Sequence, residues 1–156
     1  MIQRPKTVTP EQALVRLERL CVRSEHCTWE LRRKLEQWRI APGDADRIMS
    51  SLVGRRFVDD TRFAVAFIRD KYRFARWGRR RIALALRQKH VNADALLDDP
   101  DVLDPEQYAE ILDGLIAAKA RTLDMADRAD RQRLFRFGVS RGYEPDMVIS
   151  AIRRIR

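Results

Sequence analysis

The fold is decided by three similar stretches of sequence, LRRKLEQWRI at residues 31–40, IALALRQKHV at 82–91 and LFRFGVSRGY at 134–143. Each begins with an aliphatic residue and has an apolar residue nine positions later. A leucine follows four positions after the start in the first two stretches, and Gly138 takes its place in the third. The starts lie 51 and 52 residues apart. Self-similarity at a fixed period of this length predicts tandem structural repeats.

The segments around these stretches carry helical signals. Thr9-Pro10-Glu11-Gln12 combines a capping residue, a proline suited to the first helical position and a glutamine able to reach back to the cap. Asp104-Pro105-Glu106-Gln107 repeats this combination, and Glu144-Pro145 is a weaker version of it. Apolar residues recur at three- and four-residue intervals after each start, whereas no segment alternates with a period of two for long enough to predict a strand.

The sequence therefore predicts an all-α protein made of three tandem three-helix repeats, at residues 9–58, 59–103 and 104–156. A unit of about 50 residues buries only a small core by itself. We expect the repeats to be stacked into an elongated, curved body, because stacking buries more apolar surface and leaves long faces exposed.

The composition favours a water-soluble protein of the reducing cytosol. The 156 residues are 45% apolar, which excludes wholesale disorder. The longest apolar run, residues 63–68, is far below the ~20 residues that cross a bilayer. Residues 1–10 contain no apolar stretch of the kind that a secretory signal needs. Two cysteines, Cys21 and Cys27, make no disulfide framework and are expected to be free thiols. We expect a cytoplasmic protein without membrane contact.

The positive charge is concentrated in the first part of the chain. The net charge is +9, yet residues 91–126 hold nine acidic and only two basic side chains. The densest basic run extends from residue 69 to residue 89, which contains nine Lys and Arg residues and a single acidic residue, Asp70. An acidic middle segment between basic flanks indicates one face or end of the molecule that meets an anionic partner.

Catalysis and metal binding have no support in the sequence. His26 and His90 are the only histidines, and no phosphate-binding glycine loop, nucleophile elbow or zinc-protease motif is present. Cys21, His26 and Cys27 lack the second ligand pair that a structural zinc site requires. We therefore expect no enzyme, no cofactor and no metal.

The stretch from Arg76 to Ile82 is the most informative part of the basic run. Gly78 is expected to take a left-handed conformation that ends one helix and lets the next begin. Arg79, Arg80 and Arg81 then lie in the first turn of that helix, where its dipole disfavours cations. They either meet an anion on a partner or pair with an acid of their own chain such as Asp70.

Trp77, in the same stretch, has two interpretations. It either stacks on a base or anchors an interface, or it packs between repeats. Nearby Lys71, Arg73 and Arg76 extend the candidate surface, and Arg32-Arg33-Lys34 repeats the basic run in the first repeat.

These residues carry a resemblance to a known family. Phe57-Val58-Asp59-Asp60-Thr61-Arg62-Phe63-Ala64, followed by Gly78, Arg81-Ile82, Leu86 and Val91, resembles the central signature of the RecX regulatory family. Glu30-Leu31-Arg32-Arg33-Lys34-Leu35 resembles the first-repeat motif of that family, and Arg136-Phe137 with Arg141-Gly142-Tyr143 resembles its C-terminal pattern. The resemblance extends from about Pro10 to Ile155.

The chain departs from the family pattern at several turns. His90 stands where the family has glycine, and Trp38-Arg39 replaces Lys-Gly in the first repeat. Gly138 replaces an apolar residue, and the segment from Arg121 to Asp130 matches poorly. These departures bear on local turn geometry.

The resemblance implies a cytoplasmic negative regulator of the RecA recombinase. Such a protein binds the groove of the RecA–single-strand DNA filament and inhibits ATP hydrolysis, strand exchange and co-protease activity, with some affinity for DNA itself. We expect a monomer. The resemblance places the partner-binding role at Arg32, Arg33, Lys34, Arg79, Arg80, Arg81, Arg136 and Arg141.

Two other functions remain open at the sequence level. Three-helix units resemble helix-turn-helix modules, so a direct DNA-binding regulator is one alternative. The helix that starts at Arg79 has no base-reading amide side chain at its beginning, and no dimerisation zipper is visible. A helical adaptor for an acidic protein, without nucleic acid, is the other.

Overall fold

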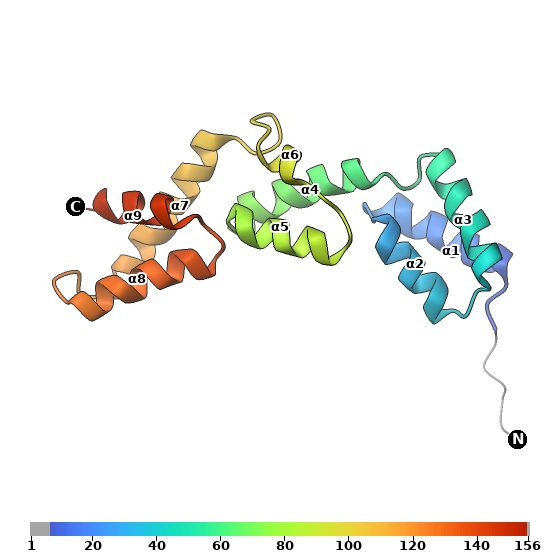
Figure 1. Ribbon diagram of the computed structural model, residues 1–156, viewed down its shortest axis with the longest axis horizontal. Helices are drawn as coiled ribbons and strands as arrows, with labels where there is room; N and C mark the ends of the chain where they lie inside the picture. The colour runs from blue at the N-terminus through green and yellow to red at the C-terminus, as the bar shows by residue number, and fades with distance from the viewer. Residues whose placement is uncertain (1–6, 156) are drawn as a thin grey trace, which may run out of the picture. The chain divides into compact units, whose positions relative to one another are not determined.

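A computed structural model describes residues 7–155, which form nine α-helices and no strand (Figure 1). The helices are α1 (Pro10–Arg23), α2 (Thr28–Gln37), α3 (Pro42–Gly54), α4 (Asp60–Arg73), α5 (Arg79–Gln88), α6 (Asp94–Leu97), α7 (Pro105–Ala120), α8 (Arg128–Ser140) and α9 (Pro145–Arg153). The predicted all-α class is confirmed. None of these helices is long and apolar enough to cross a membrane.

The predicted helix starts at Pro10, Pro105 and Pro145 are confirmed, and at the first two of them a side chain satisfies amides of the first turn. The Thr9 hydroxyl accepts a hydrogen bond from the amide of Gln12 at 3.2 Å, and the Gln12 side chain accepts one from the amide of Thr9 at 3.1 Å. Asp104 caps α7 in a similar way. The side chain of Gln107 does not complete this second box, since its oxygen accepts from Tyr72 instead.

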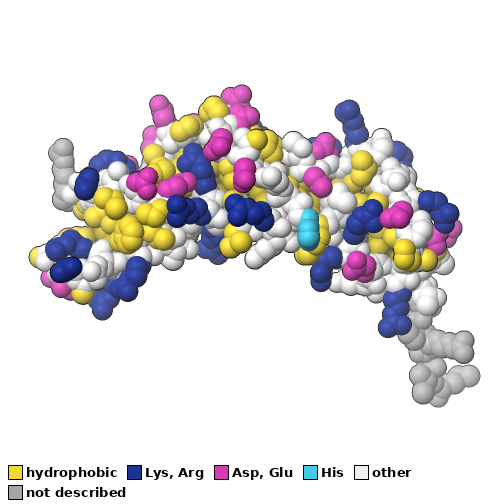
Figure 2. Space-filling view, in the orientation of Figure 1, with side chains coloured by type: hydrophobic (Ala, Val, Ile, Leu, Met, Phe, Trp, Pro, Cys, Tyr) yellow, Lys and Arg dark blue, Asp and Glu magenta, His cyan; other side chains and the backbone are white. Residues whose placement is uncertain are grey.

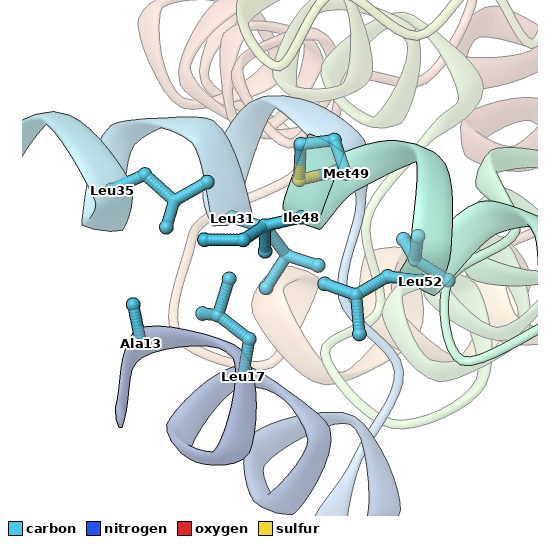
Figure 3. Close-up of a cluster of buried hydrophobic side chains, with 8 residues drawn as sticks. Ala13, Leu17, Leu31, Leu35, Ile48, Met49 and Leu52 are labelled. Atoms are coloured by element: carbon cyan, nitrogen blue, oxygen red, sulfur yellow. The ribbon is translucent and has the colours of Figure 1, made fainter. Parts of the chain in front are cut away.

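By compactness the chain divides into two units, and the division falls inside α4. The first unit holds the described residues up to Ala64 together with residues 89–91. Its core is made by the facing sides of α1, α2 and α3 (Figure 3). The buried side chains are Ala13, Leu17, Leu31, Leu35, Ile48, Met49, Leu52 and Val58.

The second unit holds residues 65–88 and the described residues from Asn92 onward. Here α7, α8 and α9 pack on one another, and α5 packs on α6. Three tyrosines are fully buried in this unit, and two of them join α4 and α5 to the helices that follow. The Tyr72 hydroxyl donates to Gln107 Oε1 at 3.0 Å, and the Tyr108 hydroxyl lies at the start of α5. The three repeat boundaries remain a prediction.

The three similar sequence stretches end in the same turn. Arg39, His90 and Gly142 occupy equivalent positions and have positive φ angles of 55°, 57° and 97°. After α2 the amide of Ile40 donates to the carbonyl of Leu35, and after α8 the amide of Tyr143 reaches the corresponding carbonyl of residue 138. Arg39 and His90, which stand where the family has glycine, therefore adopt the same left-handed conformation. A residue with a Cβ adopts it at a cost in conformational energy.

Candidate partner-binding surface

The basic run from residue 69 to residue 89 forms the end of α4, a loop and α5, and the loop is held from behind by Arg141. The Arg141 guanidinium donates from Nη2 to the carbonyls of Ala75 at 2.9 Å and Arg76 at 3.4 Å. The carbonyl of Arg141 accepts from the amide of Gly78 at 2.8 Å. Arg141, a candidate partner contact, thus uses its side chain within the molecule.

The prediction that Gly78 takes a left-handed conformation is wrong. Among the described residues of this loop, Arg76 has the positive φ, at 56°. Gly78 is needed for a different reason, because a Cβ there would overlap the backbone of Gly142 and Tyr143. Two glycines thus allow the start of α5 to lie directly against the turn between α8 and α9.

Arg79 is anchored inside the second unit. Its guanidinium lies 4.3 Å from the centre of the Tyr108 ring, and its Nη1 is 3.5 Å from Glu144 Oε1. Both charged side chains are about three-quarters buried, with exposed fractions of 25% and 23%. For Arg79 the structure therefore supplies an acidic partner within the chain, Glu144 rather than Asp70.

Tyr108 links Arg79 and Glu144 through its hydroxyl. The hydroxyl donates to Glu144 Oε2 at 3.0 Å and accepts from the Arg79 amide at 2.9 Å. Burial, reinforced by the Glu144 charge, raises the pKa of Tyr108 well above its ordinary value. The hydroxyl therefore stays protonated and keeps both bonds at physiological pH.

The first amides of α5 are not available to an external anion. The Arg79 amide is satisfied by Tyr108, and the Arg80 amide donates to the carbonyl of Gly142 at 3.0 Å. The side chain of Arg80 is different, because it is exposed and makes no ion pair in the described part of the chain. It lines an open groove of about 600 Å³ together with Arg87 and the acidic side chains Asp94 and Asp98.

Trp77 packs within the molecule. Its ring is half-buried, with Arg81 Cζ 4.1 Å and Lys71 Nζ 4.9 Å from the ring centre. Phe67 meets it edge-on, with ring centres 6.3 Å apart. All three contacts come from the second predicted repeat, so they do not show the packing between repeats that one interpretation expected, and two candidate cations lie against the ring.

Phe74 is the exposed aromatic side chain that the sequence analysis missed. It is 79% exposed and is the only aromatic among the large exposed hydrophobic residues at 7–155. One feature of the sequence points to it: Phe74 is an apolar residue inside the basic run. It follows Ile68 and Tyr72, which are the buried positions of α4 nearest to it. Arg73 precedes it and donates to the Tyr72 hydroxyl at 3.1 Å.

The basic run of α2 lies on the surface of the first unit. Arg32 Nη1 forms an ion pair with Asp46 Oδ1 at 3.0 Å, and both side chains are well exposed. Arg33 lies over the Trp29 ring at 4.9 Å. Lys34 is partly exposed and has no ion pair within the described residues.

The same unit contains a second, partly buried ion pair behind that run. Lys89 Nζ lies 3.0 Å from Glu30 Oε2, and Glu30 Oε1 also accepts from the Cys27 amide. Burial by itself would raise the pKa of Glu30, but the hydrogen bonds from Lys89 and Cys27 outweigh it and lower that pKa below its ordinary value. Glu30 is therefore ionised and structural.

On α8, Arg136 is exposed and makes no ion pair or side-chain hydrogen bond within residues 7–155. Together with Lys34, Arg76 and Arg80 it belongs to the candidate cations that no side chain of the described chain engages. Figure 2 shows Lys and Arg side chains on the displayed face beside both acidic and hydrophobic ones. The cations free for a partner are thus fewer than the sequence indicates.

The cysteines are free thiols, with Cys27 buried and Cys21 half-buried. Burial raises the pKa of Cys27 to about 11, which disfavours the reactive thiolate near neutral pH. In the part of the chain that the structure describes, no group of three or more His, Cys, Asp or Glu side chains could hold a metal ion.

Comparisons with known proteins agree with this fold and sequence pattern. The family described as "RecX, second three-helix domain" matches residues 59–96. A regulatory protein RecX of Halorhodospira halophila is 33% identical over 139 residues, covering 85% of this chain and 81% of the relative. The regulatory protein RecX of Clostridium perfringens strain 13 is 28% identical and covers 99% of this chain and 75% of the relative.

Solved structures share the fold. The crystal structure of RecX from Lactobacillus salivarius superposes with a TM-score of 0.80 at 16% identity, covering 94% of this chain and 96% of that one. A second crystal structure of a regulatory protein RecX gives 0.77 at 20% identity, covering 92% and 71%. The fold and the sequence define a helical regulatory protein. The chain belongs to the RecX family of regulatory proteins.

Proposed function

We propose that this protein is a negative regulator of the RecA recombinase. It binds in the groove of the RecA–single-strand DNA filament and inhibits ATP hydrolysis, strand exchange and co-protease activity. Membership of the RecX family carries this proposal. The net charge of +9 and the cations without internal partners support it, because they favour binding to an anionic nucleoprotein surface.

The candidate cations fall into two groups, those that other residues of the chain bind and those that they do not. Lys34, Arg76, Arg80 and Arg136 have no ion pair with another of the residues 7–155 and are proposed as direct contacts. Arg79 and Arg141 are engaged by Glu144 and by backbone carbonyls. They are proposed to shape the surface rather than to touch the filament.

The alternative of a helix-turn-helix reader loses support at α5. A recognition helix presents its N-terminal residues to base edges in the major groove. At α5 the side chain of Arg79 is not available for this role, because Tyr108 and Glu144 hold its guanidinium, whereas the side chains of Arg80 and Arg81 are exposed.

The test is the DNA-dependent ATPase activity of RecA on single-stranded DNA. Substoichiometric amounts of this protein are expected to slow ATP hydrolysis. Arg136→Glu is expected to weaken the inhibition, because it reverses an unpaired charge at the proposed surface. Arg128→Glu is the matched control, since Arg128 is also exposed on α8 and has no ion pair in the described part of the chain, but lies outside the proposed contacts.

An unchanged ATPase rate at equimolar protein and low salt would contradict the proposed function. Equal effects of the two charge reversals would instead show that net charge, and not the proposed surface, determines inhibition. The melting temperature of each variant separates these outcomes from unfolding.

A further inference from the structure

The phenylalanine side chain of Phe74 is exposed to solvent, although burying it would stabilise the fold. Its ring is 79% exposed and makes no ring stacking or cation–π contact within the described chain. The neighbouring aromatic residues are engaged: Tyr72 is fully buried, and Trp77 packs against Phe67, Lys71 and Arg81. An exposed phenylalanine next to a packed tryptophan is available for a partner.

The backbone that carries Phe74 is held in place by several bonds. The amide of Phe74 donates to the carbonyl of Asp70 at 2.9 Å, and the amide of Trp77 donates to the carbonyl of Lys71 at 2.9 Å. The Arg141 guanidinium bonds the carbonyls of residues 75 and 76. The loop is therefore pre-organised, which lowers the entropy lost when a partner binds.

The surroundings of Phe74 are cationic. Arg73 and Arg76 are exposed on either side of it in the chain. Arg73 bonds the Tyr72 hydroxyl and Gln107 through Nε, and its two Nη groups make no hydrogen bond within the described residues. Arg141 bonds the carbonyls of the loop. The nearest acid in sequence, Asp70, is 3.7 Å from Lys71 Nζ and is thereby partly compensated. The ring is thus flanked in the chain by two exposed arginines, and no cation of the described residues covers it.

An exposed aromatic ring among cations matches a single-stranded nucleic acid. Unpaired bases stack on aromatic side chains, while Lys and Arg follow the phosphates. Such binding does not depend on sequence, because every base has a π-face. An apolar protein pocket would accept the ring but would not account for the cations on both sides of it.

We infer that Phe74 stacks on an unpaired base of single-stranded DNA while Arg73 and Arg76 hold the adjacent phosphates. The inference rests on the proposed function only in that the filament supplies single-stranded DNA. It assigns the strand contact to the loop between α4 and α5 rather than to Trp77. The binding itself needs no RecA and can be measured separately.

The experiment measures binding of the full chain to fluorescein-labelled oligo(dT) by anisotropy over a range of salt concentrations. Phe74→Ala is expected to weaken binding at least about fivefold, since stacking on an aromatic side chain has an effect of this order or larger. Phe74→Trp should retain binding, whereas Phe74→Leu should lose it, because leucine keeps the apolar surface but has no π-face.

Salt dependence separates stacking from charge. Phe74→Ala should leave the slope of log K against log salt unchanged, while Arg76→Gln should reduce its magnitude by about 0.7, as expected for one phosphate contact on a single strand. Leu84→Ala is the matched control, because Leu84 is a 54% exposed apolar residue on α5 and should have no effect. The melting temperature of Phe74→Ala should be unchanged, since the ring is exposed.

Four results would overturn the inference: no binding of the wild type to oligo(dT), unchanged affinity of Phe74→Ala, full binding by Phe74→Leu, or an equal loss on duplex DNA, whose bases are already stacked. If Phe74→Ala binds oligo(dT) normally but inhibits RecA less, the ring docks on protein instead. If the wild type binds oligo(dT) through Phe74 without slowing RecA, the inference holds and the proposed function fails.

Discussion

The basic runs of α2 and α5 have the same appearance in sequence, yet the structure uses them differently. Arg32 on α2 meets Asp46 in an exposed ion pair, with exposed fractions of 46% and 69%. Arg79 on α5 lies over Tyr108 and beside Glu144, with about a quarter of its side chain exposed. Burial therefore decides which arginine is fixed inside the fold and which stays exposed at the surface.

The difference originates in the start of α5. Gly78 permits close approach of the α8–α9 turn, and that approach brings Tyr108 and Glu144 to Arg79. No glycine pair of this kind accompanies α2, whose core contacts are side chains of α1 and α3. Two runs of cations that look alike in sequence can thus differ, one being packed into the fold and the other exposed.

The largest effect is expected from Gly78→Ala. The added Cβ overlaps the backbone of Gly142 and Tyr143, which cannot move aside as a flexible side chain could. The free energy of unfolding should fall by about 3 kcal/mol, as measured by urea denaturation. Gly114→Ala in α7 is the control, because nothing lies within 4 Å of its Cβ position. It should instead raise the free energy of unfolding by about 0.5–1 kcal/mol. Similar results for both variants would refute the close contact.

An intermediate effect is expected from Arg79→Ala. Removing the guanidinium takes the cation away from Glu144 and from the Tyr108 ring, while the Tyr108 hydroxyl still bonds Glu144. The free energy of unfolding should fall by about 1–2 kcal/mol. Arg32→Ala should change it by less than about 0.5 kcal/mol, because exposed ion pairs contribute little. Thermal and urea unfolding of both variants measure the difference. Equal losses would mean that the two basic runs play the same role.

The smallest effect is expected from Arg39→Gly. Arg39 has a φ of 55°, and glycine adopts this left-handed conformation without a Cβ clash. The variant should be more stable by up to about 1 kcal/mol. Arg47→Gly makes the same exchange inside α3, where φ is helical, and should be less stable by about 1 kcal/mol. Destabilisation of both variants would show that the Arg39 side chain contributes more than the turn costs.

Much of the fold follows from local sequence signals. The capping residues Thr9 and Asp104 fix two helix starts, and the repeated stretches place α2, α5 and α8. These features depend on residues within one or two helical turns of each other, so one sequence suffices to predict them.

The candidate surface was less predictable. Trp77 is packed and Phe74 is exposed, and nothing in the sequence distinguishes the two, because aromatic character is visible in a sequence whereas exposure is not. Arg141 was also among the expected partner contacts, although that side chain bonds carbonyls 65 and 66 residues away in the chain.

The sequence by itself determined the helices, their order and the excess of positive charge, since periodicity, capping and composition are local or additive properties. Only the tertiary structure decided which charges remain free. Gly78 and Gly142 let two distant segments touch, and this contact buries Arg79 against Glu144 while Phe74 stays in solvent. Whether a charge or a ring is available to a partner depends on what the rest of the chain places beside it.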